Sequence, residues 1–170
     1  MQFKKVQRKT NRPLDRCHPK IGCIKERGWI FSVIKYWEMM RMFNHVMLGA
    51  SNINSSKQFY DATLGVLGIS SGNIDSDVRC SYRGNGGVFM IKIPIDGNPA
   101  TVGNGSTVGF KAKNEMEVDD WHAAGLANGG TTCEDPPGIR NNGKFKIYLA
   151  YLRDPAGNKL CCAYLLPKGS

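Results

Sequence analysis

The sequence lacks the features of a membrane-spanning or disulfide-rich protein. None of its apolar runs approaches the roughly 20 residues that cross a bilayer, and the longest candidate, Trp29–Ile34, is followed at once by Lys35. Six cysteines are too few for a disulfide scaffold in a chain of 170 residues. Because no export signal is recognisable, we expect a cytoplasmic protein with reduced thiols and no membrane partner.

Acidic residues are scarce in the first quarter of the chain. Residues 1–42 hold eleven Lys/Arg and three Asp/Glu, whereas residues 43–170 hold twelve and eleven. Such a basic arm could bind nucleic acid or an acidic membrane surface. It could equally be a poorly ordered extension, or a leader translated from an upstream start codon. We expect nucleic acid binding only through residues 1–42, in which the apolar residues 29–37 favour packing on the body or on a second subunit.

The remaining chain contains an internal repeat. Residues 44–68 and 106–130 follow the same pattern of small and large residues at an offset of 62 positions, so that Phe59 corresponds to Trp121. Each copy begins with the alternation of a strand and continues with the spacing of a helix. Agreement over 25 positions indicates a duplication.

Strands are expected after each helix. The first copy has two candidates around a glycine-rich turn and the second copy has three, at residues 77–83, 88–94, 131–134, 145–153 and 159–166. Small sheets of this kind need a second layer to cover their apolar faces. We therefore predict an α+β fold in which two tandem βαβββ modules form curled mixed sheets around a cleft. The modules would cover residues 43–102 and 103–167, with residues 168–170 as a tail.

The ends of both helices carry recognisable signals. Asn52 and Asn114 are typical N-cap residues, and Glu117 completes a capping box with Asn114. Gly68 and the pair Gly129–Gly130 supply the left-handed residue at which helices often end.

Three stretches in this order resemble the vicinal oxygen chelate superfamily, the glyoxalase/bleomycin resistance/dioxygenase group. They are Phe43–Leu48 in the first strand, Lys57–Gly65 in the first helix and Arg153–Leu160 in the last hairpin. Further stretches, such as residues 96–101 and 137–140, resemble a bacterial glyoxalase-like subgroup of unassigned activity. The resemblance implies a cleft between two modules, a divalent ion in the metal-dependent members, and a homodimer.

The resemblance also implies a set of metal-ligand positions, of which this chain fills one. His45 matches the histidine of the first strand, but its counterpart in the second copy is Thr107. Cys161 stands where the final glutamate is usual, and residues 88–94 contain no acid or histidine. Such a donor set is poor for a divalent ion, so we expect neither a metal nor another cofactor.

His45 and Cys161 are the candidates for catalysis. His45 is either a hydrogen-bonded core or cleft residue, or a ligand contact or general base with a reference pKa near ~6.5. Cys161 is either a small apolar residue or a nucleophile that His45 approaches in space.

The cleft walls should be apolar and aromatic. The candidates are Thr107, Phe89, Met90, Ile91, Tyr148, Tyr151 and Tyr164. Strand alternation allows only some of them to face inward. Arg140 lies in a predicted flexible loop at residues 136–143, where it either closes over the cleft and holds an anion or is solvated.

Three functions fit the sequence. The first is a protein of the bleomycin-resistance type that binds a small, aromatic or anionic molecule in a metal-free cleft, and the missing ligands favour it. The second is a glyoxalase-like lyase or isomerase that moves a proton next to a carbonyl, so enzymatic activity stays open. The third is association with nucleic acid through the basic arm.

Overall fold

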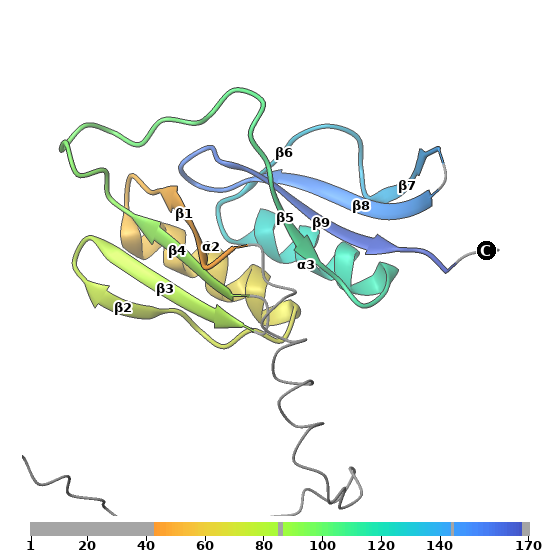
Figure 1. The fold of residues 1–170 in the computed structure, drawn as a ribbon, viewed down its shortest axis with the longest axis horizontal. Helices are drawn as coiled ribbons and strands as arrows, with labels where there is room; N and C mark the ends of the chain where they lie inside the picture. Colours follow the sequence, from red (N-terminus) through yellow and green to blue (C-terminus); the bar gives the residue numbers. More distant parts are fainter. Residues whose placement is uncertain (1–42, 85–86, 144, 168–170) are drawn as a thin grey trace, which may run out of the picture. The chain divides into compact units, whose positions relative to one another are not determined.

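The computed structural model describes residues 43–84, 87–143 and 145–167, which belong to one compact unit. Each of the two modules consists of a strand, a helix and further strands (Figure 1). The first module contains β1 (His45–Gly49), α2 (Ile53–Val66), β2 (Asn73–Ser76), β3 (Arg79–Gly84) and β4 (Gly87–Lys92). The second contains β5 (Val108–Lys111), α3 (Glu115–Ala127), β6 (Thr131–Thr132), β7 (Gly138–Asn142), β8 (Phe145–Arg153) and β9 (Lys159–Leu165).

Each module forms one mixed sheet. Sheet A has the strand order β1-β4-β3-β2, and sheet B has the order β5-β9-β8-β6, with β7 also paired to β8. The first strand of each module runs parallel to the last, while the other pairs are antiparallel. The predicted fold class is confirmed. The offset of 62 holds for the helices, which begin at Ile53 and Glu115.

Two strands differ from the sequence-based expectation. Strand β2 was not predicted, because its four residues are polar or flanked by polar residues and all are exposed. The prediction of a flexible loop at residues 136–143 is wrong, since β7 occupies Gly138–Asn142 and pairs with β8 from Gly138↔Leu149 to Asn142↔Phe145. The Pro and Gly residues of this stretch favoured a loop in the sequence analysis, whereas the strand forms mainly through its backbone pairing with β8.

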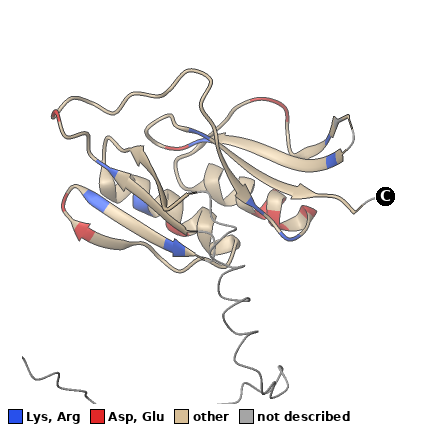
Figure 2. Cartoon of the chain, in the orientation of Figure 1, with Lys and Arg blue, Asp and Glu red and all other residues tan. Residues whose placement is uncertain are grey.

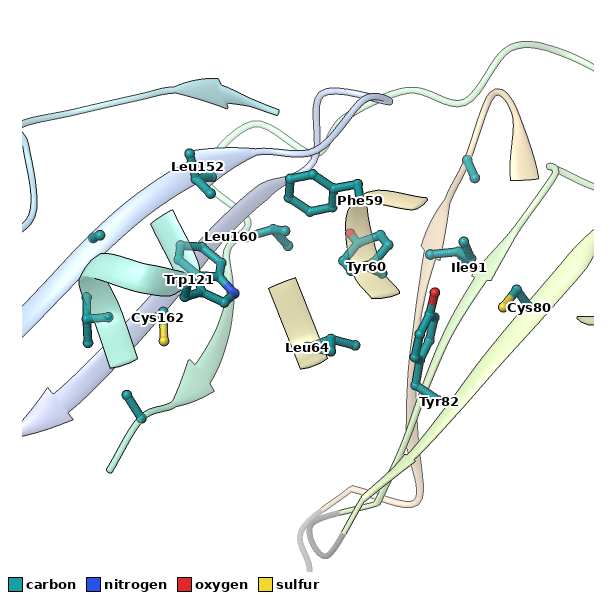
Figure 3. Close-up of a cluster of buried hydrophobic side chains, with 14 of the residues drawn as sticks. Phe59, Tyr60, Leu64, Cys80, Tyr82, Ile91, Trp121, Leu152, Leu160 and Cys162 are labelled. Atoms are coloured by element: carbon teal, nitrogen blue, oxygen red, sulfur yellow. The ribbon is translucent and has the colours of Figure 1, made fainter. Parts of the chain in front are cut away.

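The two helices lie between the two sheets. Helix α2 packs on β3 and β4, helix α3 packs on β8 and β9, and the helices pack on each other. Figure 3 shows side chains of both helices between the strands of the two sheets. The fully buried Phe59, Tyr60 and Leu64 of α2 and Trp121 of α3 form the centre of one core.

Aromatic contacts join the two modules within this core. The Tyr60 ring lies 4.8 Å from that of Phe89 and 6.1 Å from that of Tyr82, measured between centroids. Phe89 of β4 meets Phe110 of β5 edge to face at 5.5 Å. Such pairs add about 0.5–1.5 kcal/mol beyond the area that they bury.

The predicted helix signals are found in the structure. The side chains of Asn52 and Asn114 accept hydrogen bonds from the backbone amides of Ser55 and Glu117. The Glu117 carboxylate reaches back to the amide of Lys113, one residue before the expected partner Asn114. Both helices are followed by a glycine with positive φ, at Gly68 (77°) and Gly129 (88°).

A buried polar network connects the modules at the turn between β8 and β9. Asp154, 4% exposed, accepts hydrogen bonds from the backbone amides of Ala156 and Asn158 and from the hydroxyl of Tyr60. The Asn158 amide group donates to Asp154 and to the carbonyl of Gly49 in β1. The turn between β8 and β9 of the second module therefore holds β1 and α2 of the first module in place.

The predictions about residues 1–42 lie outside the described residues. Among the helices that the structure describes, none has the length and apolarity needed to cross a membrane.

Candidate functional site

Each sheet has one face that neither of the described helices, α2 and α3, covers. On β4, Phe89 and Ile91 point to α2, so Val88 and Met90 lie on the opposite side. We call this side the open face of sheet A; it is formed by residues paired in register, His45, Met47, Ser81, Arg83, Val88 and Met90. By the same alternation the open face of sheet B consists of Ile147, Leu149, Tyr151, Cys161, Ala163 and Leu165.

His45 is an exposed residue at the beginning of β1. Its Nδ1 lies 3.2 Å from the Oδ1 of Asn44, the residue before the strand, so the side chain is bonded to its sequence neighbour and not across to another strand. With Nδ1 donating to this carbonyl, Nε2 is left to face a ligand as acceptor or, in the cation, as donor. The expectation of a core histidine is therefore not met, while contact with a ligand or a role as base stays a prediction.

Cys161 lies on the open face of sheet B beside its cross-strand partner Tyr151. It is 8% exposed, and burial raises the pKa of its thiol to about 11, although a hydrogen bond with Tyr151 acts in the opposite direction. Lys159 lies with its Nζ 4.6 Å from the centre of the Tyr151 ring and is ion-paired to Glu134. A thiol with so high a pKa is protonated at neutral pH, which favours the inert role.

The predicted cleft walls divide between the two sides of the sheets. Met90 lies on the open face of sheet A and Tyr151 on the open face of sheet B. Tyr148 points to helix α3, where its hydroxyl donates to Asp119 at 2.9 Å, so the prediction that it lines the cleft is wrong. Phe89, Ile91 and Tyr164 also belong to the helix-covered side. Thr107 is exposed directly before β5.

Arg140 does not lie in a mobile flap. It belongs to β7, and its guanidinium donates to the carbonyls of Pro136 and Ile139, with the Asp135 carboxylate 3.8 Å away. These contacts with its own turn and strand engage the guanidinium, which was expected from the sequence either to hold an anion or to be solvated.

A single chain does not bring His45, Thr107 and Cys161 together as a metal site requires. The helices separate the two sheets, so the open faces that carry His45 and Cys161 are turned away from each other. Within the described part of the chain, no three His, Cys, Asp or Glu side chains converge on one point. The donors of one chain therefore do not fit the divalent ion that the fold family implies.

His45 lines a groove on the surface of the described body. The groove has a volume of about 590 Å³ and runs between the end of sheet A and strand β5. Its lining includes His45, Arg83 and Val88 as well as Phe89 and Phe110. Arg83 was missed in the sequence, although the turn after it predicted a hairpin that would place it opposite Val88 and hence near His45.

Together, the paired modules and the open faces define a protein of the vicinal oxygen chelate type. The family model of the Glyoxalase/Bleomycin resistance protein/Dioxygenase superfamily matches residues 42–162, and the chain belongs to this family. No protein with a curated function shows significant similarity to it.

Solved structures agree with this assignment. The chain is 56% identical to a glyoxalase/bleomycin resistance protein from Albidiferax ferrireducens T118, over 72% of this chain and 98% of that one, with a TM-score of 0.69. A glyoxalase/bleomycin resistance protein/dioxygenase family enzyme from Burkholderia phytofirmans PsJN is 18% identical, over 72% and 98%, with a TM-score of 0.58. A glyoxalase-related enzyme from Fulvimarina pelagi is also 18% identical, over 73% and 88%, at 0.56. The last two support the fold alone.

Proposed function

We propose that this protein binds a small aromatic or anionic molecule, without a metal, in a cleft that two copies of the chain build together. The observation that carries the proposal is the opposite orientation of the two open faces. A cleft between two curled sheets, as the family resemblance implies, needs the open face of sheet A from one copy and that of sheet B from the other. His45 of one copy would then face Cys161 of its partner.

The open faces have the composition of a buried surface. Sheet B presents an apolar row along β8 and β9, in which Leu165 is 56% exposed, and sheet A presents Met47, 41% exposed, beside Met90. Large apolar side chains that are exposed on an uncovered sheet face favour an interaction site. A second copy supplies the complementary sheet, which supports a homodimer.

The proposal of a metal-free site rests on the chemistry of the donors. Even with two copies combined, the matched positions offer one imidazole, one hydroxyl and one thiol, at His45, Thr107 and Cys161. Divalent ions in such sites are held by several imidazoles and carboxylates. A small-molecule binding protein needs only the apolar walls and a few polar contacts.

The dimer is tested by placing a charge on the open face. Leu165→Lys should convert the dimer into a monomer in size-exclusion chromatography with light scattering, because a buried lysine would lose its hydration. Ile95→Lys is the matched control, since Ile95 is 93% exposed in the segment between the modules. A monomeric parent chain, or a Leu165→Lys variant that stays dimeric, would contradict the shared cleft.

A glyoxalase-like lyase or isomerase is the second candidate. It is supported by the exposed His45, whose Nδ1 is bonded to Asn44, which leaves Nε2 for a ligand. Metal analysis after incubation with Zn, Ni, Mn, Co and Fe(II) separates the two functions. Less than about a tenth of an equivalent of each metal supports the binding protein, whereas near-stoichiometric uptake that is lost in His45→Ala supports the enzyme.

A further inference from the structure

One cation on the open face of sheet A lies beside His45 in a fixed register. His45 pairs with Val88 of β4, and Val88 pairs with Arg83 of β3. Side chains paired in this way lie on the same face, on strands about 4.8 Å apart. His45 and Arg83 therefore flank Val88, whose short side chain leaves room between the two longer ones.

Arg83 has no carboxylate partner among the residues that the structure describes. The only acid on the four strands of sheet A is Asp75, which is bound to Arg79 at 3.1 Å and to Asn73 and Ser81. Figure 2 shows the basic positions at the two ends of β3, with the acidic one on β2. Arg79 is thus neutralised by its neighbour, whereas the charge of Arg83 is available.

The groove beside this row has cationic and apolar lining but no acid. Its charged lining residues are Arg83 and Lys111, and neither is ion-paired to a carboxylate within the described residues. The rest of the lining is mainly apolar and includes Leu64, Phe89 and Phe110. A neutral ligand would leave the cations without a partner, while an anion with an apolar body would match both parts.

We propose that Arg83 binds a carboxylate or phosphate group of the ligand, with the Nε2 of His45 beside it and the apolar body of the ligand in the groove. The planar guanidinium offers two parallel donors to such an oxyanion. This inference rests on the proposed function, because His45 and Arg83 lie on the open face of sheet A that the shared cleft would use. It extends that site around the end of the sheet into the groove and names the class of ligand and the residue that selects it.

The experiment compares matched probes on three proteins. Binding of 4-fluorophenylacetate, 4-fluorophenyl phosphate and the neutral 4-fluorophenylacetamide is followed by ¹⁹F NMR titration on the full chain, Arg83→Gln and Arg79→Gln. Arg79→Gln is the control because it removes the arginine that Asp75 already neutralises. Arg83→Lys keeps the charge without the paired donors, and thermal unfolding confirms that each variant is folded.

We expect at least one anionic probe to bind the parent chain about tenfold or more tightly than the amide. Arg83→Gln should remove this preference, Arg83→Lys should restore part of it, and Arg79→Gln should change it less than about twofold. Equal binding of acid and amide, unchanged in Arg83→Gln, overturns the role of Arg83 but leaves a small-molecule site in place. Binding of none of the probes contradicts the anion site and also weakens the proposed function.

Discussion

At the scale of single residues, Asp154 has the densest set of hydrogen bonds in the described body. Its carboxylate is almost fully buried and accepts from two backbone amides, from Tyr60 and from Asn158. Burial, followed by the charge of Asp154, raises the pKa of Tyr60 well above its usual range, so this hydroxyl stays a donor. The turn is therefore held by a carboxylate that satisfies the Tyr60 hydroxyl, while Asn158 also reaches the carbonyl of Gly49.

Replacing Asp154 should destabilise the body strongly. In Asp154→Ala the Tyr60 hydroxyl and the backbone amide of Asn158 lose their acceptor. We expect a loss of about 3 kcal/mol in the free energy of unfolding, measured with urea. The control is Asp96→Ala, because Asp96 also accepts from the backbone two residues on but is exposed. That variant should lose less than about 1 kcal/mol. Similar losses in both variants would show that the buried network is not the cause.

Because two buried thiols have raised pKa values, we expect the protein to lose stability at alkaline pH. Burial raises the pKa of Cys161 from 9.0 to about 11 and that of Cys162 to about 12. The folded state thus holds these protons more tightly than the unfolded state, so the stabilisation is complete below pH 9 and is lost as the pH rises towards 11. Urea unfolding between pH 8 and pH 11 measures the decline, and Cys161→Ala should make it shallower. A pH-independent stability in this range would refute the assignment.

At the scale of elements, two helical glycines have opposite surroundings. A Cβ at Gly125 of α3 would lie 2.3 Å from the Cδ1 of Leu152 and 3.2 Å from the Cε2 of Phe59. A Cβ at Gly65 of α2 would meet nothing within 4 Å. The first glycine lets a helix approach its neighbours, whereas the second serves no contact of this kind.

Alanine at these two positions should therefore change stability in opposite directions. Gly65→Ala should stabilise the protein by about 0.5–1 kcal/mol through helix propensity. Gly125→Ala should destabilise it by about 1–3 kcal/mol, because overpacking against Leu152 and Phe59 exceeds that gain. Thermal and urea unfolding of both variants measure the difference. A stabilised Gly125→Ala variant would mean that the helices and sheet B separate at little cost.

The elements that the sequence predicted are those with strong periodic or capping signals. The helices after Asn52 and Asn114 and the long strands β8 and β9 combine apolar alternation or helical spacing with clear ends. Strands β2 and β7 lacked this signal because exposed polar residues and a Pro-Gly sequence obscured them. Their formation depends on pairing with β3 and β8, which is a tertiary effect that local sequence does not report.

At the scale of the whole molecule, the site was harder to predict than the fold. Alternation along β4 and β8 correctly limited which wall candidates share a face, but it did not say which face the helices cover. Tyr148 and Met90 were therefore given the same role, although one lies under α3 and the other on the open face. Nor did it show that the helices separate His45 from Cys161 within one chain.

The basic arm can be separated from the body by truncation. A chain that begins at Met42 loses eleven of the 23 Lys/Arg and should keep its melting temperature and its binding of the anionic probe, because the described unit contains the proposed site. Any binding of duplex DNA, measured by fluorescence anisotropy at low salt, should disappear with the arm. DNA binding that survives the truncation would place the contact in the nearly neutral body instead.

The hydrogen bond from Asn158 to Gly49 joins residues 109 positions apart, and the bond from Tyr60 to Asp154 joins residues 94 apart. Contacts of such separation require the intervening chain to be closed into a loop before they can form, which slows folding. On the ribosome, the first module emerges with the partners of Gly49 and Tyr60 still unsynthesised. The body therefore completes its structure only after residues 154–158 have left the exit tunnel. A nascent chain stalled before Asp154 should remain open to chaperones and proteases.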